Sequence, residues 1–319
     1  MLKISIALIS ALFLPCAAAF VPHQVVNRAP HSPLFLADGN GDTDSLSRRD
    51  ILQTAFSGGT VAALTFLSSS PAQAEEEADA SPVSSSQIKN VVVAGATGQT
   101  GSRIFARLID QSFETTGGVR NTAKATKSLG KANGDKLKRL DVVEDSLDDL
   151  VATLNGADGL IIACGMNPGK NLLRMSAAAR EVDNVGTCKL IDAAKQANVK
   201  KVVMVSSILT NGRAWGQEDS PGFKITNAFG NALDEKLVAE KYLRASGLDY
   251  TIVRPGGLKV EAPVGGLSVN AEDTLNSGEI SRDLVADVCV ASLNDPKTTN
   301  KVLEIIEDNG PPRVFNGIM

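Results

Sequence analysis

Histidine is nearly absent from this sequence of 319 residues, which holds only His23 and His31. Both precede residue 89, where we expect the folded domain to begin, so that domain would contain no histidine. A Ser-His-Asp or Cys-His mechanism and a histidine-ligated metal are therefore excluded for the folded domain.

Cysteine is also scarce, and its spacing is irregular. The chain has four cysteines, and they are Cys16, Cys164, Cys188 and Cys289. Cys16 falls in the N-terminal leader, so the remaining set is odd in number and has no repeated spacing. Such a set predicts neither a disulfide framework nor a zinc site, and we expect no metal.

Clusters of basic residues and long apolar runs are missing as well. The chain has 32 Lys and Arg against 36 Asp and Glu, a formal net charge of −4. A nucleic-acid surface needs clustered basic side chains, and a membrane-spanning helix needs roughly 18 to 20 apolar residues. We therefore expect neither a nucleic-acid partner nor an integral membrane span in the mature chain.

Residues 1–19 have the pattern of a signal peptide. Lys3 precedes the apolar stretch Ile4–Leu14, and Ala17–Ala19 has the small residues of a cleavage site. Phe20 follows at once, and a small-residue site followed by Phe resembles the bipartite plastid-targeting leaders of algae with secondary plastids. The leader therefore predicts delivery to a plastid.

A second targeting pattern lies within residues 20–74, the predicted transit region. Ser47–Leu52 resembles a twin-arginine motif, Ala55–Leu67 is apolar, and Ala72–Ala74 has the small residues of a second cleavage site. These three parts in order predict passage into the thylakoid lumen. The alternative is a single transit peptide with a chance arginine pair, which would leave the protein in the stroma.

The predicted folded domain covers residues 89–319, behind a flexible linker at residues 75–88 that is acidic and then contains Ser and Pro. Within it, short β-branched runs alternate with helical patterns, which predicts a single α/β domain with a doubly wound parallel sheet, the Rossmann fold. The main predicted strands are Asn90–Ala94, Leu137–Val142, Leu160–Cys164, Lys201–Ser207, Tyr250–Arg254 and Val302–Ile306. The main predicted helices are Ser146–Leu154, Val182–Ala197 and Ala232–Ala245.

A glycine-rich turn lies between the first predicted strand and a helical pattern, and its spacing is G-x-x-G-x-x-G. Gly95 permits a tight exit from the strand, Gly98 lets a pyrophosphate approach the backbone, and Gly101 lets the helix pack on the sheet. The helix N-terminus presents free N–H groups to phosphates. The predicted cofactor-binding residues of this turn are Gly95, Thr97, Gly98, Gln99, Thr100 and Gly101.

Two further residues indicate which dinucleotide binds. Arg120 follows the next strand about 20 residues beyond the turn, where an NAD-binding domain has an acidic residue. An arginine there suits a 2′-phosphate, so the predicted cofactor is NADP(H). Asp141, at the end of the third strand, is expected near the adenine.

Several segments, taken in order, resemble the atypical short-chain dehydrogenase/reductase family in its NmrA-like, NAD(P)H-binding branch. The resemblance covers about residues 89–308. The segments are Gly95–Gly101, Val119–Asn121, Leu190–Ala194, Val203–Ser207, Ala239–Leu243, Tyr250–Gly256 and Ile280–Arg282.

The resemblance also implies a catalytic arrangement, because family members use a Ser after the fifth strand and a Tyr-x-x-x-Lys pair on the next helix. Ser206 or Ser207 matches the Ser, Ser206 being our candidate, and Lys236 matches the Lys that supports catalysis and binds the cofactor. Ala232 stands at the Tyr position. Alanine cannot transfer a proton, so the usual general acid is missing.

Other candidates for contacts with the cofactor come from strand ends. Cys164 follows the fourth strand and is expected beside the nicotinamide, and Pro255 is a further predicted cofactor-binding residue. Neither tyrosine is expected to replace the missing one. Tyr242 faces away from Lys236 on the same helix, Tyr250 lies within a strand, and both are expected to pack in the core.

Two functions remain open from the sequence. The first is an NADPH-dependent reductase of a small plastid quinone, pigment or carbonyl compound. The second is a non-catalytic NADP(H)-binding protein that senses redox state or helps to assemble photosynthetic complexes. The expected partner is accordingly a small-molecule substrate or a photosynthetic-complex protein, and segments Gly165–Ser176 and Ile208–Asn231 are expected to face it.

Overall fold

Strands and helices alternate along most of the chain in a computed structural model, which describes residues 87–167, 174–228 and 230–311. The strands are β1 (Asn90–Ala94), β2 (Glu114–Val119), β3 (Leu137–Arg139), β4 (Gly159–Ile162), β5 (Lys201–Val205), β6 (Asp249–Pro255), β7 (Gly257–Lys259), β8 (Gly266–Asn270), β9 (Glu279–Ser281) and β10 (Lys301–Asp308). The α-helices are α1 (Gln99–Asp110), α2 (Thr122–Leu129), α3 (Leu147–Leu154), α4 (Met175–Ala179), α5 (Thr187–Gln196), α6 (Pro221–Asn227), α7 (Ala232–Ala245) and α8 (Arg282–Ala291).

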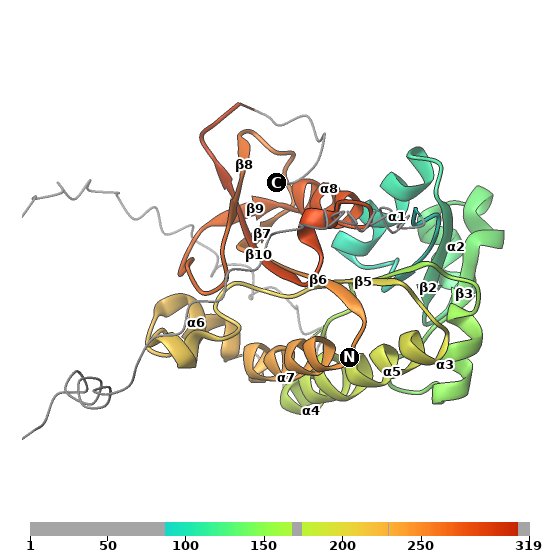
Figure 1. Cartoon of the computed structure of the whole chain (residues 1–319), viewed down its shortest axis with the longest axis horizontal. Coiled ribbons are helices and arrows are strands. Elements are labelled where there is room, and N and C mark those ends of the chain that lie inside the picture. The colour runs from blue at the N-terminus through green and yellow to red at the C-terminus, as the bar shows by residue number, and fades with distance from the viewer. Residues whose placement is uncertain (1–86, 168–173, 229, 312–319) are drawn as a thin grey trace, which may run out of the picture. The chain divides into compact units, whose positions relative to one another are not determined.

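An eight-stranded sheet has the order β3-β2-β1-β4-β5-β6-β10-β8 (Figure 1). All neighbours are parallel except β8, which pairs antiparallel with β10. The first six strands have the order of a doubly wound dinucleotide-binding sheet. In such a sheet the chain builds strands outward in one direction from β1 and then in the other direction from β4, so the strand order reverses between these two. The predicted fold class, a doubly wound parallel sheet of the Rossmann type, is confirmed. Strands β7 and β9 form a separate parallel pair.

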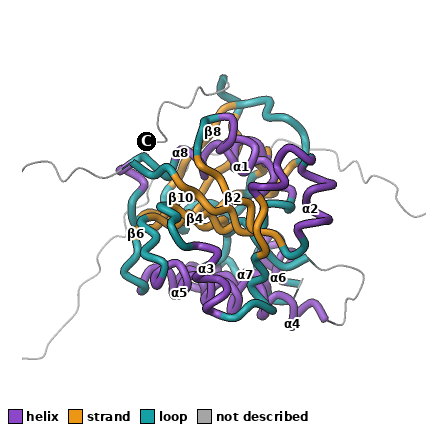
Figure 2. The backbone as a smooth tube through the Cα atoms, turned by 90° about the vertical axis from the view of Figure 1, so that its right-hand side faces the viewer, coloured by secondary structure: helices purple, strands orange, loops and turns teal. Residues whose placement is uncertain are grey.

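Both faces of the sheet are covered by helices (Figure 2). Alternate residues of β1 show this: Val91 and Val93 pack in one cluster with apolar residues of α1 and α8, whereas Val92 and Ala94 pack in another with α3, α5 and α7. A strand that is buried on both faces has no polar side to expose. This double burial explains why β1 is an almost continuous apolar run.

Two predicted elements have the bounds that the sequence pattern gave them, Asn90–Ala94 and Ala232–Ala245. Two others differ. The third strand ends at Arg139 because Asp141 Oδ1 accepts the N–H groups of Val143 and Glu144, which turns the chain. The helix predicted at Val182–Ala197 begins as a π-helical segment, Arg180–Gly186, and continues as α5.

Ile88, the second of the described residues, is anchored to the rest of the structure. Its side chain is buried, and its backbone N–H donates to Asn294 Oδ1 at 2.9 Å. The predicted signal peptide, transit region and twin-arginine signal lie outside the described residues, as does the linker up to residue 86. None of the described helices is both long and apolar enough to cross a bilayer.

A buried charge cluster joins the C-terminal half of the sheet to α7. Arg254 at the end of β6 is fully buried and forms ion pairs with Glu240 at 2.6 Å and Glu304 at 3.3 Å, both also fully buried. It pairs in addition with Glu272 and Asp273, on the segment after β8. One guanidinium therefore holds four carboxylates from α7, β10 and a loop.

Replacing Arg254 with Met is expected to lower the free energy of unfolding by about 3–5 kcal/mol, because Glu240 and Glu304 would stay buried without a counter-charge. Urea unfolding of the purified variant measures this change. The matched control is Arg213→Met, which removes an ion pair with Asp234 on the surface and should cost about 1 kcal/mol or less. Equal losses in the two variants would contradict the prediction.

Candidate nucleotide-binding site

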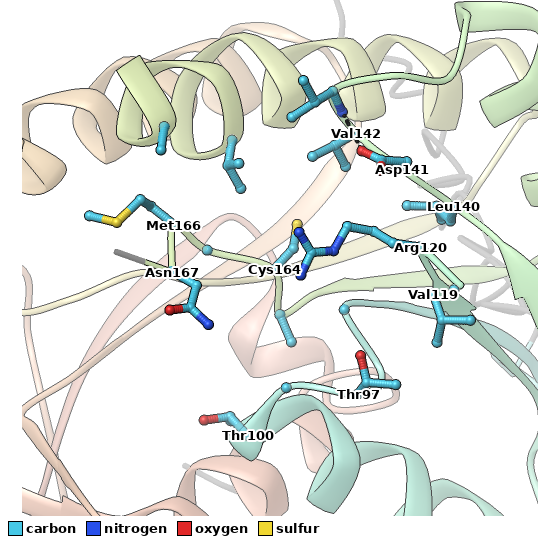
Figure 3. A pocket seen from close by; sticks show the side chains of 18 of the residues that line it. Thr97, Thr100, Val119, Arg120, Leu140, Asp141, Val142, Cys164, Met166 and Asn167 are labelled. Carbon is cyan, nitrogen blue, oxygen red and sulfur yellow. Dashed lines mark hydrogen bonds between the residues drawn. The ribbon is translucent and has the colours of Figure 1, made fainter. Parts of the chain in front are cut away.

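A pocket of about 840 Å³ opens at the carboxyl ends of β1, β2 and β4, where the strand order reverses (Figure 3). This is the position at which open α/β sheets bind their ligands, and the volume lies within the roughly 300–1,000 Å³ of small-molecule sites. The predicted cofactor-binding residues that line it are Gly95, Thr97, Gly98, Gln99, Thr100, Arg120, Asp141 and Cys164.

Each of the three glycines of the turn is glycine for a different structural reason. Gly95 has a φ of +84°, and a Cβ there would lie 2.8 Å from the backbone nitrogen of Cys164. A Cβ at Gly101 would lie 2.1 Å from the carbonyl oxygen of Gly95. Gly98 has ordinary extended angles and is exposed on the pocket wall, and its Cβ would come no closer than 3.2 Å to the Gly95 oxygen. The fold requires Gly95 and Gly101, whereas Gly98 leaves room for a ligand.

Helix α1 begins at the wall of the pocket. Its N-cap is Gly98, which has no side chain to accept a hydrogen bond from the first turn. Thr97 and Thr100 lie at the same wall (Figure 3). The N-terminus of a helix carries a partial positive charge and unsatisfied N–H donors, so this end of the pocket suits phosphate oxygens.

Arg120 lies directly after β2, and its guanidinium extends across the pocket toward Cys164 (Figure 3). The nearby carboxylates of Glu144 and Asp145 both pair with Arg139 instead. Within the described ranges, Arg120 forms no ion pair. Its charge is therefore available to an anionic ligand in the cavity.

Cys164 follows β4 and also lines the pocket. Burial of the thiol, with the negative charge of Asp183 nearby, raises its pKa to about 11. A raised pKa keeps the thiol protonated at every pH well below that value. Cys164 is therefore a neutral pocket wall rather than a thiolate nucleophile.

Lys236 on α7 lies behind that wall. Its ammonium donates to Asp183 Oδ1 at 2.9 Å, and Asp183 Oδ2 accepts the backbone N–H of Met166 at 3.1 Å. Burial alone would lower the pKa of Lys236, but the Asp183 carboxylate outweighs it and the pKa is raised. The lysine is held charged, and Asp183 fixes both the lysine and the pocket-lining segment at Met166.

Four candidate residues do not line the cavity: Gly101, which packs against Gly95, and Lys236, Ser206 and Pro255. Ser206 is buried, and its hydroxyl donates to Glu240 Oε1 at 2.5 Å, within the charge cluster around Arg254. Pro255 ends β6, and its carbonyl accepts the N–H of Ile208. The structure therefore gives Ser206 a partner away from the pocket.

The expectation that both tyrosines pack in the core is wrong for Tyr242. Its side chain is exposed, and its hydroxyl donates to Asp192 Oδ1 at 2.7 Å. Tyr250 is half-buried in β6.

Sequence reasoning missed two charged residues of this region. Asp183 is buried in the π-helical segment, and only its tertiary partners reveal a role. Arg282 begins α8 and lines the pocket, although it is more than 160 positions from Arg120 in the sequence. Its place in a segment that resembles the family was the only signal in the sequence that pointed to it.

Comparison with known proteins shows the family of this chain. The family model for NAD(P)H-binding proteins matches residues 95–296. A chloroplast protein of Arabidopsis thaliana is 44% identical over 227 residues, which cover 70% of this chain and 79% of that protein. Sanguinarine reductase of Eschscholzia californica is 32% identical over 257 residues, covering 69% of this chain and 90% of the reductase.

Two further comparisons are more limited in reach. Protein TIC 62 of Pisum sativum, also chloroplastic, is 34% identical over 242 residues, which cover 70% of this chain but only 43% of TIC 62. The crystal structure of the oxidoreductase YlbE from Lactococcus lactis superposes with a TM-score of 0.57 at 24% identity, covering 70% of this chain and 92% of YlbE. That similarity shows the fold.

The sheet order and the glycine turn together define a dinucleotide-binding protein of the Rossmann type. Within that class, the chain belongs to the NAD(P)H-binding family, which confirms the resemblance noted in the sequence.

Replacing Gly98 with Val is expected to weaken NADPH binding by roughly 100-fold or more, because a side chain there would occupy the approach to the helix N-terminus. The stability of the free protein should change by about 1 kcal/mol or less, since the position is exposed and extended. Titration calorimetry and urea unfolding measure the two effects.

The matched control is Gly101→Ala, whose Cβ would lie 2.1 Å from the Gly95 oxygen. This variant should lose stability, by at least the roughly 1–3 kcal/mol of an overpacked core. If Gly98→Val bound NADPH as well as the unmodified protein, the pocket would not be the nucleotide site.

Proposed function

We propose that this chain binds NADP(H) in the pocket and acts as an NADPH-dependent reductase of a small quinone, pigment or carbonyl compound in the plastid. The observation that carries the cofactor choice is Arg120, a cation without an ion-pair partner among the described residues, at the end of β2. That position binds the adenosine ribose in this fold, and a guanidinium there suits a 2′-phosphate.

The residues around the pocket fit such a cofactor. Gly98 and the start of α1 leave room and N–H donors for phosphates, and Asp141 lies at the β3 side, where the adenine is expected. When bound, the cofactor supplies the hydride. The chain holds a charged lysine, Lys236, behind the wall formed by Cys164 and Gly165.

Support for a reductase and for the plastid comes from the relatives. One of them is sanguinarine reductase, and two others are chloroplast proteins. The paired arginines Arg48 and Arg49 in the leader support the thylakoid lumen as the destination, with the stroma as the alternative.

The second candidate function is a non-catalytic NADP(H)-binding protein, either a redox sensor or an assembly factor for photosynthetic complexes. Ala232 favours it, because this residue begins α7 at the position of the family's general acid. Ser206 favours it too, because its hydroxyl is bound to Glu240 rather than lining the pocket. Both observations concern proton transfer and leave cofactor binding intact.

Replacing Arg120 with Ala is expected to weaken NADPH binding roughly 10- to 100-fold, because charge-assisted hydrogen bonds to the 2′-phosphate contribute about 1.5–3 kcal/mol. NADH lacks that phosphate, so its affinity should stay within about twofold and serves as the internal control. Titration calorimetry with both nucleotides measures the difference. Equal affinities of the unmodified protein for NADPH and NADH would contradict the assignment.

Oxidation of NADPH with a panel of quinones and carbonyl compounds tests the reductase directly. We expect slow turnover, since general acid catalysis contributes about 10²- to 10⁴-fold and Ala232 cannot provide it. Ala232→Tyr should raise the rate, because residues 232 and 236 lie one helical turn apart on α7.

The matched control for this test is Ala232→Phe, which adds the ring without the hydroxyl and should leave the rate low. Fast turnover by the unmodified protein would show that another group supplies the proton. Tight NADPH binding with no turnover on any substrate would favour the non-catalytic function.

A further inference from the structure

Arg282 is a charged pocket residue that forms no ion pair with any carboxylate among the described residues. It is the first residue of α8 and lines the pocket. The adjacent Asp283 is already paired with Arg103 at 3.4 Å and Arg107 at 3.0 Å. Across the part of the chain that the structure describes, Arg282 forms no ion pair, and its Nη1 atom is buried without a hydrogen-bond partner.

The surroundings of this guanidinium are unfavourable in the free protein. Burial and the positive charge of Arg103 lower the pKa of Arg282, and the Glu261 carboxylate opposes them only in part. Arg103 itself is bound, since it donates to the carbonyl oxygens of Gln99 and Val260. Arg282 is half-buried, and its buried Nη1 donor without a partner costs free energy that a bound anion would recover.

The position of Arg282 indicates which anion this is. The same cavity is lined by Thr97, Gly98, Gln99 and Thr100 at the start of α1, and Arg103, one turn further along α1, lies close enough to repel Arg282. A helix N-terminus and a guanidinium therefore meet at one end of the pocket. In this fold the α1 N-terminus is where the diphosphate of a dinucleotide binds.

We infer that Arg282 binds the diphosphate of the dinucleotide, an inference that rests on the proposed use of this pocket for NADP(H). Arg120 and Arg282 then have separate tasks, whereas Arg174, the third arginine of the pocket lining, is paired with Glu181. Arg120 recognises the 2′-phosphate and distinguishes NADPH from NADH. Arg282 binds the diphosphate, which both nucleotides contain, and contributes affinity without choosing between them.

Titration calorimetry on the purified protein separates these tasks with three probes: NADPH, NADH and adenosine 2′-monophosphate, which has no diphosphate. Arg282→Gln should weaken NADPH and NADH binding by the same factor, roughly 10- to 100-fold, and leave adenosine 2′-monophosphate unchanged. Arg120→Gln should instead weaken NADPH and adenosine 2′-monophosphate and spare NADH. The control variant is Arg213→Gln, an exposed arginine outside the pocket, which should change none of the three.

The outcomes that overturn the inference are distinct from failure of the proposed function. If Arg282→Gln binds both dinucleotides like the unmodified protein, the anion belongs to another ligand, such as a substrate carboxylate. A loss confined to NADPH would assign Arg282 to the 2′-phosphate, which also contradicts the inference. If the unmodified protein binds neither dinucleotide, the proposed function itself fails.

Stability gives a second readout that a purely structural arginine would not reproduce. Because Arg282 has no ion-pair partner among the described residues, free Arg282→Met should unfold at the same temperature as the unmodified protein or higher, while saturating NADPH should raise that temperature by less. A lower unfolding temperature of the free variant would mark Arg282 as structural and overturn the inference.

Discussion

The close approach of α1 to the end of β1 is the constraint on which the site depends. The Gly95 carbonyl lies where a side chain at position 101 would begin, so the helix can start at the sheet edge only if residue 101 is glycine. This contact aims the N-terminus of α1 at the pocket. The order reversal between β1 and β4 opens the space in front of it. Packing of two glycines thus produces an anion-binding end of the cavity.

Charged side chains elsewhere in the domain are paired, in contrast to two arginines of the pocket. Arg254 holds four carboxylates in the interior, Arg139 holds two on the surface beside β3, and Asp183 holds Lys236. Two of the arginines that line the pocket, Arg120 and Arg282, form no ion pairs within the described residues. Since the chain as a whole is acidic, unneutralised cations in one cavity are a local feature rather than a consequence of composition. Such a cavity suits an anionic ligand, which is what the proposed dinucleotide is.

The sequence predicted the parts of this site that local pattern determines. The glycine turn, the arginine after β2 and the bounds of β1 and α7 follow from short-range rules about turns, strand ends and helical periodicity. It could not predict Asp183 or Arg282, because their roles arise from neighbours that are distant in the chain, Lys236 and Arg103. The sequence could not predict the partner of Ser206 for the same reason. That partner is Glu240, which also pairs with Arg254, and these residues come together only in the folded domain.

The residues proposed to bind the nucleotide and the residues that would transfer a proton lie on different elements of the structure. The residues proposed to face the phosphates lie on α1, directly after β2 and at the start of α8, whereas the groups that would transfer a proton lie on α7 and beyond β5. On the proton-handling side, Ala232 has no acidic group, Ser206 is engaged with Glu240, and Lys236 is engaged with Asp183. A chain can lose the proton donor at position 232 without disturbing the pocket, because Ala232 is not among the residues that line it. A measurement of cofactor binding therefore tests whether this pocket is the nucleotide site, and only a measurement of turnover tests whether the protein is a reductase.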